Sequence, residues 1–353
     1  MNTYKVIGVM SGTSLDGLDL AYCHFTFDRN QWQYRILKAV TIEYEETRKT
    51  KLNRVMQGSA LEITEADAEL GTFIGKEIRK MVTDNKLEVD FISSHGHTIF
   101  HQPAKGFTLQ IGSGPHIAAA SKLPVVCDFR SLDVALGGQG APLVPVGDKL
   151  LFGASGYCLN LGGIANISFD QAGNRIAFDI CPANIILNNL AAKSGKAYDE
   201  NGDLARKGKV DASLLEKLDG LDYYQAKFPK SIGREWIDEV VFPILENSAI
   251  SNEDKLATFC RHIATQTSQI LLRSGGEMLI TGGGAFNQYL IENIREACAG
   301  KVKVVVPDKD TIMFKEALIF GFLGVLRMRN EVNCLSSVTG ANRDNVGGAV
   351  YTI

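Results

Sequence analysis

The first part of the chain consists of short apolar runs separated by polar turns. Residues 4–10 are rich in β-forming side chains and predict a buried strand, and residues 19–27 and 31–44 predict two more. These three strands would form an antiparallel meander, with a short turn of Gly, Ser, Thr and Asp between the first two. Two helices are then predicted at residues 46–57 and 64–85.

The start of the second helix and the strand that follows it can be predicted more closely. Thr64 is followed three residues later by Asp67, which resembles a capping box with Asp in place of Glu or Gln. We therefore expect this helix to begin at Thr64. Residues 89–94 predict a further buried strand, followed by a polar run at residues 95–97.

The second half of the chain repeats this order. Strands are predicted at residues 157–160, 164–169 and 175–179, with paired glycines in the turn between the first two. A further strand is predicted at residues 278–281. The predicted helices of this half lie at residues 184–193, 234–245, 254–272, 287–299 and 315–329.

Each half thus begins with a hairpin whose turn contains glycine and continues into alternating strands and helices. This repetition predicts a duplicated α/β unit with a cleft between the copies, and it disfavours one large sheet. We place the domains at residues 1–150 and 151–353. We leave open whether the C-terminal segment packs back on the first domain.

Composition narrows the class of protein. The chain has 353 residues, of which 45% are hydrophobic and 22% are charged, so disorder, collagen and coiled coil are excluded. The formal net charge of −3 disfavours a nucleic-acid partner. A small anionic ligand remains compatible with this charge, because backbone dipoles and a few basic side chains can hold it.

Cysteine usage and hydropathy point to a compartment. The seven cysteines are scattered and form no Cys-x-x-Cys pair, which favours reduced thiols over a disulfide framework. No apolar run approaches the ~20 residues of a membrane span. The N-terminus runs directly into a predicted strand, without the pattern of a signal peptide. We therefore expect a cytoplasmic protein with no membrane partner.

The turn at residues 12–17 is the first candidate for chemistry. Its glycines allow backbone N–H groups to surround an anion, and its hydroxyls add donors. Asp16 and Asp19 could bind Mg²⁺, through water. The segment is not a Walker loop, because Gly-Lys-Ser/Thr is missing and it links two strands. A plain hairpin turn remains an equal alternative on spacing alone.

Two further glycine clusters follow strands in the second half. Gly162 and Gly163 could complete a phosphate clamp, although paired glycines are also common in tight hairpins. The triple glycine at residues 282–284 lies between a strand and a helix. It permits close approach of a flat ligand such as adenine, and close packing of the helix on the sheet explains it equally well.

Asp179 and the polar segments near Arg130 complete the candidates. Asp179 ends a strand beside a predicted helix start, where it could accept a proton or simply cap that helix. The glycine-rich segments around Arg130 suit a sugar site, in which amides and one Arg meet hydroxyls and a carboxylate. A salt-bridged Arg130 without a ligand is the alternative. His97 lies among alternating histidines that lack a carboxylate partner, so a sugar pocket is favoured over a metal site.

Ten motifs, in order and over essentially the whole chain, resemble those of the anhydro-N-acetylmuramic acid kinases, sugar kinases of the actin–hexokinase–chaperone ATPase superfamily. They are VIGVMSGTSLDGLD at residues 6–19, HGHT at 95–98, TLQIG at 108–112, DFR at 128–130, GGQGAPLVP at 137–145, NLGGIANIS at 160–168, PKSIGRE at 229–235, GGG at 282–284, KEA at 315–317 and SVTGA at 337–341.

This resemblance implies two ribonuclease H-like α/β domains with an interdomain cleft. It also implies a reaction in which ATP phosphorylates O6 of 1,6-anhydro-N-acetylmuramic acid while water opens the anhydro ring at C1. The product would be N-acetylmuramic acid 6-phosphate, in peptidoglycan recycling. ATP and Mg²⁺ would be the cofactors, the amino sugar the small-molecule partner, and a homodimer the assembly.

The resemblance also assigns site residues, with sugar-site loops in residues 1–150 and the nucleotide site in residues 151–353. Asp179 would be the general base, and Arg130 would assist catalysis. The nucleotide would contact the first turn and the later glycine clusters, namely Gly12, Thr13, Ser14, Leu15, Asp16, Gly17, Leu18, Asp19, Gly162, Gly163, Gly282, Gly283, Gly284 and Asn287. The sugar would be held by polar side chains and one glycine, namely His97, Gln110, Arg130, Gln139, Gly140 and Glu316.

Some positions depart from the family's pattern. The family has Asp-Thr-Gly-Pro-Gly-Asn where residues 179–184 are DICPAN, so Cys181 and Ala183 replace two glycines. Asn188 stands in place of a family Asp, and His97 in place of a Gln. Two alternatives stay open: a kinase or ATPase of the same fold for another sugar, or a nucleotide-binding sensor with weak activity. The retained aspartate argues against the sensor.

Overall fold

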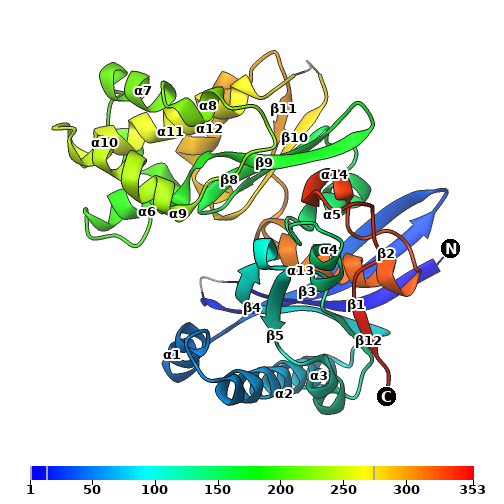
Figure 1. The fold of residues 1–353 in the computed structure, drawn as a ribbon. Helices are drawn as coiled ribbons and strands as arrows, with labels where there is room; N and C mark the ends of the chain where they lie inside the picture. Colours follow the sequence, from blue (N-terminus) through cyan, green and yellow to red (C-terminus); the bar gives the residue numbers. More distant parts are fainter. Residues whose placement is uncertain (1, 13–14, 273–274) are drawn as a thin grey trace. The chain divides into compact units, whose positions relative to one another are not determined.

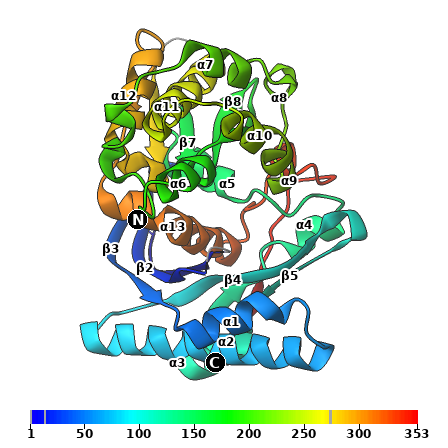
Figure 2. The same ribbon diagram turned by 90° about the vertical axis from the view of Figure 1, so that its left-hand side faces the viewer.

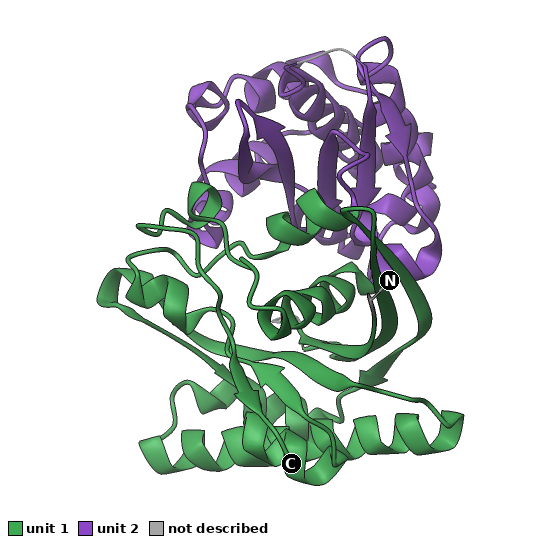
Figure 3. Ribbon diagram, turned by 90° about the vertical axis from the view of Figure 1, so that its right-hand side faces the viewer, with its two compact units in different colours: residues 1–151, 314–353 green, residues 152–313 purple. Residues whose placement is uncertain are grey.

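The computed structural model describes residues 2–12, 15–272 and 275–353, which form two compact units. The first unit comprises Met1–Leu151 and Phe314–Ile353, and the second comprises Phe152–Met313 (Figure 3). Each unit contains one β-sheet with helices around it (Figure 1). The C-terminal segment of the chain therefore belongs to the same unit as the N-terminal strands.

The sheet of the first unit has the strand order β12-β6-β4-β1-β2-β3, and β5 pairs with β4. β1, β2 and β3 pair antiparallel, which confirms the predicted meander. β4 and β6 extend the sheet in parallel with β1. The strands are β1 (Asn2–Ser11), β2 (Gly17–Asp28), β3 (Gln31–Glu43), β4 (Phe91–Gln102), β5 (Phe107–Ile111), β6 (Val125–Cys127) and β12 (Ala349–Tyr351).

The sheet of the second unit has the order β11-β10-β7-β8-β9. β8 runs antiparallel to β7 and β9, whereas β10 and β11 run parallel to β7. The series β3-β2-β1-β4-β6 of the first sheet has the same order and directions, so the duplicated ribonuclease H-like α/β architecture is confirmed. The strands are β7 (Tyr157–Leu161), β8 (Ile164–Gln171), β9 (Asn174–Pro182), β10 (Glu277–Thr281) and β11 (Lys303–Val305).

Helices cover both faces of the first sheet. On one face lie α1 (Glu46–Val55), α2 (Ala60–Asn85) and α3 (Gly114–Ser121), which share a buried core with β1 and β4 (Figure 2). On the other face lies α13 (Lys309–Met328), of which residues 314–328 belong to this unit. A Cβ on Gly8 of β1 would lie only 1.9 Å from the carbonyl oxygen of Ala317, so the helix can approach the strand only at a glycine.

The expected start of α2 at Thr64 is wrong. Ser59 is the N-cap, and its hydroxyl accepts a hydrogen bond from the N–H of Glu62 at 3.3 Å. The Glu62 carboxylate in turn accepts from the N–H of Ser59 at 2.6 Å, which completes a capping box one turn earlier. Asp67 instead accepts from the N–H of Gly112 and so joins α2 to β5.

In the second unit α6 (Asn184–Ala192), α11 (Asn252–Gln269) and α12 (Gln288–Ala297) pack against the sheet around one apolar core. The single helix predicted at residues 234–245 is wrong in detail. A π-helical turn, Ile237–Val241, separates α9 (Arg234–Trp236) from α10 (Phe242–Glu246). Pro243 has no N–H to donate to the preceding turn, which favours this local widening.

The remaining helices are short and were not predicted. They are α4 (Ser131–Ala135), α5 (Val144–Leu151), α7 (Ala212–Asp219), α8 (Asp222–Gln225) and α14 (Ser336–Thr339), together with the 3₁₀ turns Pro103–Lys105, Glu200–Gly202, Ala205–Lys207 and Gly283–Phe286. In the part of the chain that the structure describes, no helix is long and apolar enough to cross a bilayer. All seven cysteines are free thiols.

Candidate active site

The predicted phosphate turn connects β1 to β2 in the first unit. Leu15 has a positive φ of 58° and donates its N–H to the carbonyl oxygen of Gly12 at 3.2 Å. A Cβ on Gly17 would lie 2.6 Å from the carbonyl oxygen of Ile42. The turn is therefore tight and needs glycine at its second end. Thr13 and Ser14, the two predicted hydroxyl donors, lie outside the described residues.

Two carboxylates flank this turn. Asp19 is half-buried and accepts a hydrogen bond from the hydroxyl of Thr41 at 2.5 Å. Burial raises the pKa of Asp19, and the negative charge of the exposed Asp16 raises it further. Two like charges that disfavour each other in this way would both be stabilised by a cation. Among the described residues, no group of three or more His, Cys, Asp or Glu side chains could hold a metal ion directly.

A buried hydrogen-bonded trio lies at the β1 end of the turn. The hydroxyl of Tyr44 donates to Ser11 Oγ at 2.8 Å, and Ser11 Oγ lies 3.1 Å from His97 Nδ1. Burial lowers the pKa of His97, so its ring is neutral at neutral pH. His97, a predicted sugar ligand, is therefore tied directly to the last residue of β1.

Arg130 is the centre of the second cluster in the first unit. Its Nε donates to His95 Nε2 at 3.0 Å, and its Nη1 donates to the carbonyl oxygen of Gly140 at 2.6 Å. His95 Nδ1 lies 3.0 Å from the carbonyl oxygen of Gly96, which it can only contact as a donor. The ring is thus neutral, in agreement with a pKa that burial and Arg130 hold well below the usual value.

Glu316, on α13, provides the opposite charge for Arg130. Although Glu316 remains accessible to solvent, the surrounding protein atoms desolvate its carboxyl group and raise its pKa, and Arg130 opposes this effect. Burial lowers the pKa of Arg130 to about 10, while the Glu316 charge raises it. The guanidinium is therefore charged at neutral pH. A direct salt bridge, the alternative considered for Arg130, is absent from its described contacts.

The two predicted glutamines lie on either side of this cluster in the chain. Gln110, on β5, donates its side-chain amide to Thr108 Oγ1 at 2.8 Å and to Thr98 Oγ1 at 3.3 Å. Gln139 is exposed, and its backbone N–H donates to the carbonyl oxygen of Thr339 at 2.8 Å. Gln110 is thus held by its side chain, whereas Gln139 is held by its backbone and has an accessible side chain.

In the second unit, the glycine turn between β7 and β8 contacts the start of α6. The carbonyl oxygen of Gly163 accepts from the N–H groups of Ala183 and Ile185, and that of Gly162 accepts from the N–H of Asn184. These bonds satisfy N–H groups that a helix start leaves free. The turn therefore fixes where α6 begins, at the residues that follow β9.

The triple glycine meets the same edge of the sheet. A Cβ on Gly282 would lie 2.6 Å from Asn160 Oδ1, and one on Gly284 would lie 2.7 Å from the Cβ of Leu161. The structure thus brings together the two glycine clusters that the sequence placed 120 residues apart. Asn287 caps α12 by accepting from the N–H of Leu290 at 2.9 Å, which gives it a structural role in addition to the predicted one.

Asp179, on β9, is held by α8 and the loop that follows it, at residues 223–232. Its Oδ2 accepts from the N–H of Ile232 at 3.0 Å, its N–H donates to the carbonyl oxygen of Lys230 at 3.0 Å, and its carbonyl oxygen accepts from the hydroxyl of Tyr223 at 2.6 Å. Burial raises the pKa of its carboxyl group, and the Ile232 bond moderates this effect. Asp179 does not cap α6, whose N-cap is Ala183.

Comparison with known proteins gives these residues a context. The family model described as anhydro-N-acetylmuramic acid kinase matches residues 4–353. The relative of that name from Acinetobacter baylyi is 34% identical over 98% of this chain and 99% of its own length. The one from Sulfurovum sp. is 33% identical over 99% of this chain and 100% of its own length.

The chain belongs to the anhydro-N-acetylmuramic acid kinase family. It is therefore a phosphotransferase that uses a nucleotide. Membership confirms the resemblance drawn from the ordered motifs, and those motifs now have places in the structure. VIGVMSGTSLDGLD spans the end of β1, the first turn and the start of β2, while NLGGIANIS spans the end of β7, the second glycine turn and part of β8.

Within this kinase, Asp133 and Tyr223 were missed as site residues, and His95 was named only as part of the HGHT motif and of the alternating histidines. His95 and Asp133 lie in or beside recognised motifs and contact the Arg130 cluster, and Tyr223 contacts Asp179. For His95 and Asp133, a polar residue within or next to a motif was the signal that could have identified them. Tyr223 lies 44 residues from Asp179 in the chain, and no local pattern connects them.

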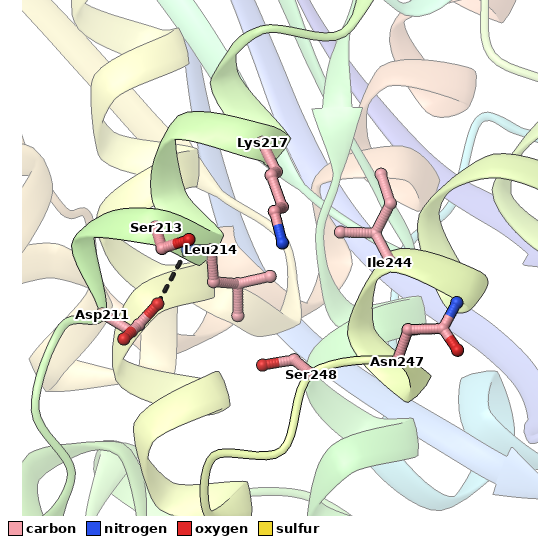
Figure 4. A pocket seen from close by; sticks show the side chains of 7 residues that line it. All are labelled: Asp211, Ser213, Leu214, Lys217, Ile244, Asn247 and Ser248. Carbon is pink, nitrogen blue, oxygen red and sulfur yellow. Dashed lines mark hydrogen bonds between the residues drawn. The ribbon is translucent and has the colours of Figure 1, made fainter.

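A surface hollow of about 230 Å³ lies apart from these residues, between α7 and α10 of the second unit (Figure 4). Lys217 points toward it, and Ser248 and Asn247 lie on its opposite side. The Asp211 carboxylate at its rim accepts from the N–H of Leu214 and caps α7. None of its lining residues belongs to the candidate active site.

Proposed function

We propose that this kinase converts 1,6-anhydro-N-acetylmuramic acid, ATP and water into N-acetylmuramic acid 6-phosphate and ADP, as in peptidoglycan recycling. The observation that carries the proposal is the setting of Asp179. Its carboxylate is half-buried, accepts a backbone hydrogen bond and has a raised pKa. A carboxylate of this kind is suited to act as a general base.

In this reaction Asp179 takes a proton from water as the water oxygen bonds to C1 of the sugar. The bond from C1 to the bridging oxygen breaks, and its electron pair stays on that oxygen, which remains attached to C6. That oxygen bonds to the γ-phosphorus of ATP as the bond from phosphorus to ADP breaks. Ring opening and phosphoryl transfer are thus coupled through one oxygen atom.

Residues of the first unit support binding of the phosphates and Mg²⁺. The tight β1–β2 turn, with its positive φ at Leu15 and its essential Gly17, suits close approach of an anion. Asp16 and Asp19, whose charges disfavour each other, would hold Mg²⁺ through water, and the ion would neutralise phosphate charge when bound. In the second unit, the glycines at residues 162–163 and 282–284 would contact the nucleotide, together with Asn287.

The sugar would be held by the first unit. Arg130 uses two of its five N–H groups on His95 and Gly140, so donors remain for a carboxylate or hydroxyl of the substrate. His97, Gln110 and the accessible Gln139 supply further polar contacts, and Glu316 lies on α13 near Arg130. The muramic acid carboxylate provides the negative charge that such an arginine would recognise.

We further propose that the protein works in the cytoplasm as a homodimer. Its free thiols fit a reducing compartment. Size-exclusion chromatography with light scattering measures the mass of the particle in solution. A mass near that of one chain would contradict the homodimer.

The reaction is tested by incubating the protein with ATP, Mg²⁺ and a panel of anhydro and ordinary amino sugars. ADP release and sugar phosphate are followed together. We expect both only with 1,6-anhydro-N-acetylmuramic acid. Stimulation by a different sugar would favour a kinase of the same fold with another substrate. ATP binding without sugar-dependent ADP release would favour a nucleotide-binding sensor.

A further inference from the structure

Asp133, on the short helix α4, is a fully buried carboxylate that joins the loop at residues 137–140 to the segment at residues 334–345. Its Oδ2 accepts from the N–H of Gly140 at 2.8 Å. Its Oδ1 accepts from Thr339 Oγ1 at 2.9 Å, from Asn345 Nδ2 at 2.9 Å and from Cys334 Sγ at 3.0 Å. Four donors on one buried carboxylate fix its position closely.

This carboxylate explains Gly138, the second glycine of the GGQG segment at residues 137–140. A Cβ on Gly138 would lie 2.2 Å from Asp133 Oδ2, so no other residue fits while the carboxylate keeps its place. Gly140 has a positive φ of 66°, which favours glycine there as well. The path of the loop through Gln139 is therefore set by Asp133.

Gly140 connects this arrangement to Arg130. The N–H of Gly140 donates to Asp133, and the carbonyl oxygen of the same residue accepts from Arg130 Nη1 at 2.6 Å. A shift of Asp133 would move both groups of Gly140 together. The direction of the guanidinium thus depends on a carboxylate that does not touch it.

The C-terminal motif SVTGA at residues 337–341 had no role in the function proposed above. Thr339 holds Asp133 through its hydroxyl and holds the N–H of Gln139 through its carbonyl oxygen. The segment at residues 334–345 is itself closed by a β-bridge between Cys334 and Asn345, both of which donate to Asp133. The motif therefore supports the loop that carries Gln139.

We propose that Asp133 and Thr339 are positioning residues for the sugar side of the site. They set the position of Gln139 and, through Gly140, the direction of the Arg130 guanidinium. Residues 334–345 therefore affect sugar binding through the loop that they contact. This inference rests on the proposed function, because it assumes that Arg130 and Gln139 contact the sugar.

The test compares Thr339→Val with Thr339→Ser in the full chain. Valine removes the hydroxyl that donates to Asp133 with little change of shape, whereas serine keeps it. Thr267→Val is the matched control, because Thr267 is also buried and its hydroxyl donates to a backbone carbonyl, that of Ile263, within α11 of the second unit. For each variant the melting temperature and the KM values for the anhydro sugar and for ATP are measured.

We expect Thr339→Val to raise the KM for the sugar by about tenfold or more while the KM for ATP stays within about twofold. Thr339→Ser should restore the sugar KM, and Thr267→Val should lower the melting temperature without changing either KM. An unchanged sugar KM in Thr339→Val, an equal change in both KM values, or no recovery in Thr339→Ser would overturn the inference. A wild type that does not turn over the anhydro sugar would instead overturn the proposed function, and this inference with it.

Discussion

The two units repeat one strand order but hold their candidate site residues in different ways. In the first unit, neighbouring side chains take part: His95 accepts from Arg130, which also donates to the backbone carbonyl of Gly140, and Thr41 donates to Asp19. In the second unit, Asp179 is fixed mainly by backbone groups of the segment at residues 223–232. The duplicated fold therefore supplies similar frames, within which different kinds of contact orient the polar groups.

This difference predicts how each half-site tolerates substitution. A backbone donor such as the N–H of Ile232 remains when the side chain of that residue is changed. Substitutions around Asp179 should therefore have small effects on activity, whereas substitution of Asp179 itself should have a large one. The first unit should behave in the opposite way. There, a change in a neighbouring side chain should alter the site even when Arg130 is intact.

The largest effect is expected for Asp179→Asn. The amide cannot accept a proton from water at C1, so we expect turnover to fall by about 1,000-fold or more while ATP binding is retained. ADP release gives the turnover, and calorimetry with ATP gives the binding. The Ile232→Val variant is the control, because it keeps the backbone N–H that donates to Asp179. Turnover within about tenfold of wild type in Asp179→Asn would remove it from the base role.

Gly138→Ala should cause the next largest effect. Its Cβ would overlap Oδ2 of Asp133, whose carboxylate is held by four donors, so we expect a loss of about 1–3 kcal/mol in the free energy of unfolding. Gly156→Ala is a control, since the nearest atom to its Cβ would be 3.9 Å away and its φ is not positive. Equal unfolding midpoints in denaturant for the two variants would show that Asp133 is not fixed as described.

Tyr223→Phe should have a smaller effect. It removes the hydroxyl that donates to the carbonyl oxygen of Asp179, while the Ile232 and Lys230 backbone bonds remain. We expect a decrease in kcat of about two- to tenfold with little change in either KM. A loss of kcat as large as that of Asp179→Asn would show that a side chain, rather than the backbone, controls this half-site.

The smallest effect on stability is expected for His95→Gln, and it increases as the pH falls. The pKa of His95 is held well below 6.5 in the folded protein, so below about pH 6.5 the unfolded chain takes up a proton that the folded protein does not. The contribution of neutral His95 is thus present above that pH and is lost as the pH falls. Glutamine can still accept from Arg130 but does not titrate.

We therefore expect the difference in melting temperature between the two proteins to shift in favour of His95→Gln as the pH is lowered from about 7.5 to about 5. Because other titrating groups are common to both proteins, the difference isolates His95. A difference that stays constant over this range would contradict the neutral, Arg130-bonded form of the ring.

The sequence was sufficient for the repeated α/β order and for the two glycine hairpins, because alternation and turn residues are local signals. The sequence pattern did not predict the elements between residues 103 and 151. Short helices and strands there, such as α4 and β6, are too short to show the hydrophobic periodicity of a helix or strand. The start of α2 was misplaced because Ser59 and Thr64 both precede an acidic residue by three positions. Only the reciprocal bonds distinguish the two.

Asp179 and Arg130, whose roles stay predictions, could be named from the sequence because each lies in or next to a motif. Their supporting contacts could not be predicted, because they depend on distant segments. Asp133 and Thr339 are 206 residues apart in the chain, and their hydrogen bond exists only because the C-terminal segment joins the first unit. No local pattern in the sequence predicts this hydrogen bond, which becomes visible only in the structure around the buried carboxylate.

The central claim is that one oxygen atom couples ring opening to phosphoryl transfer. It is tested most directly by running the reaction in ¹⁸O-labelled water and analysing the product by mass spectrometry at the earliest times. We predict that the new sugar phosphate carries the label at C1 and none in its phosphate. Label in the phosphate, or ADP formed together with labelled inorganic phosphate alone, would contradict the account.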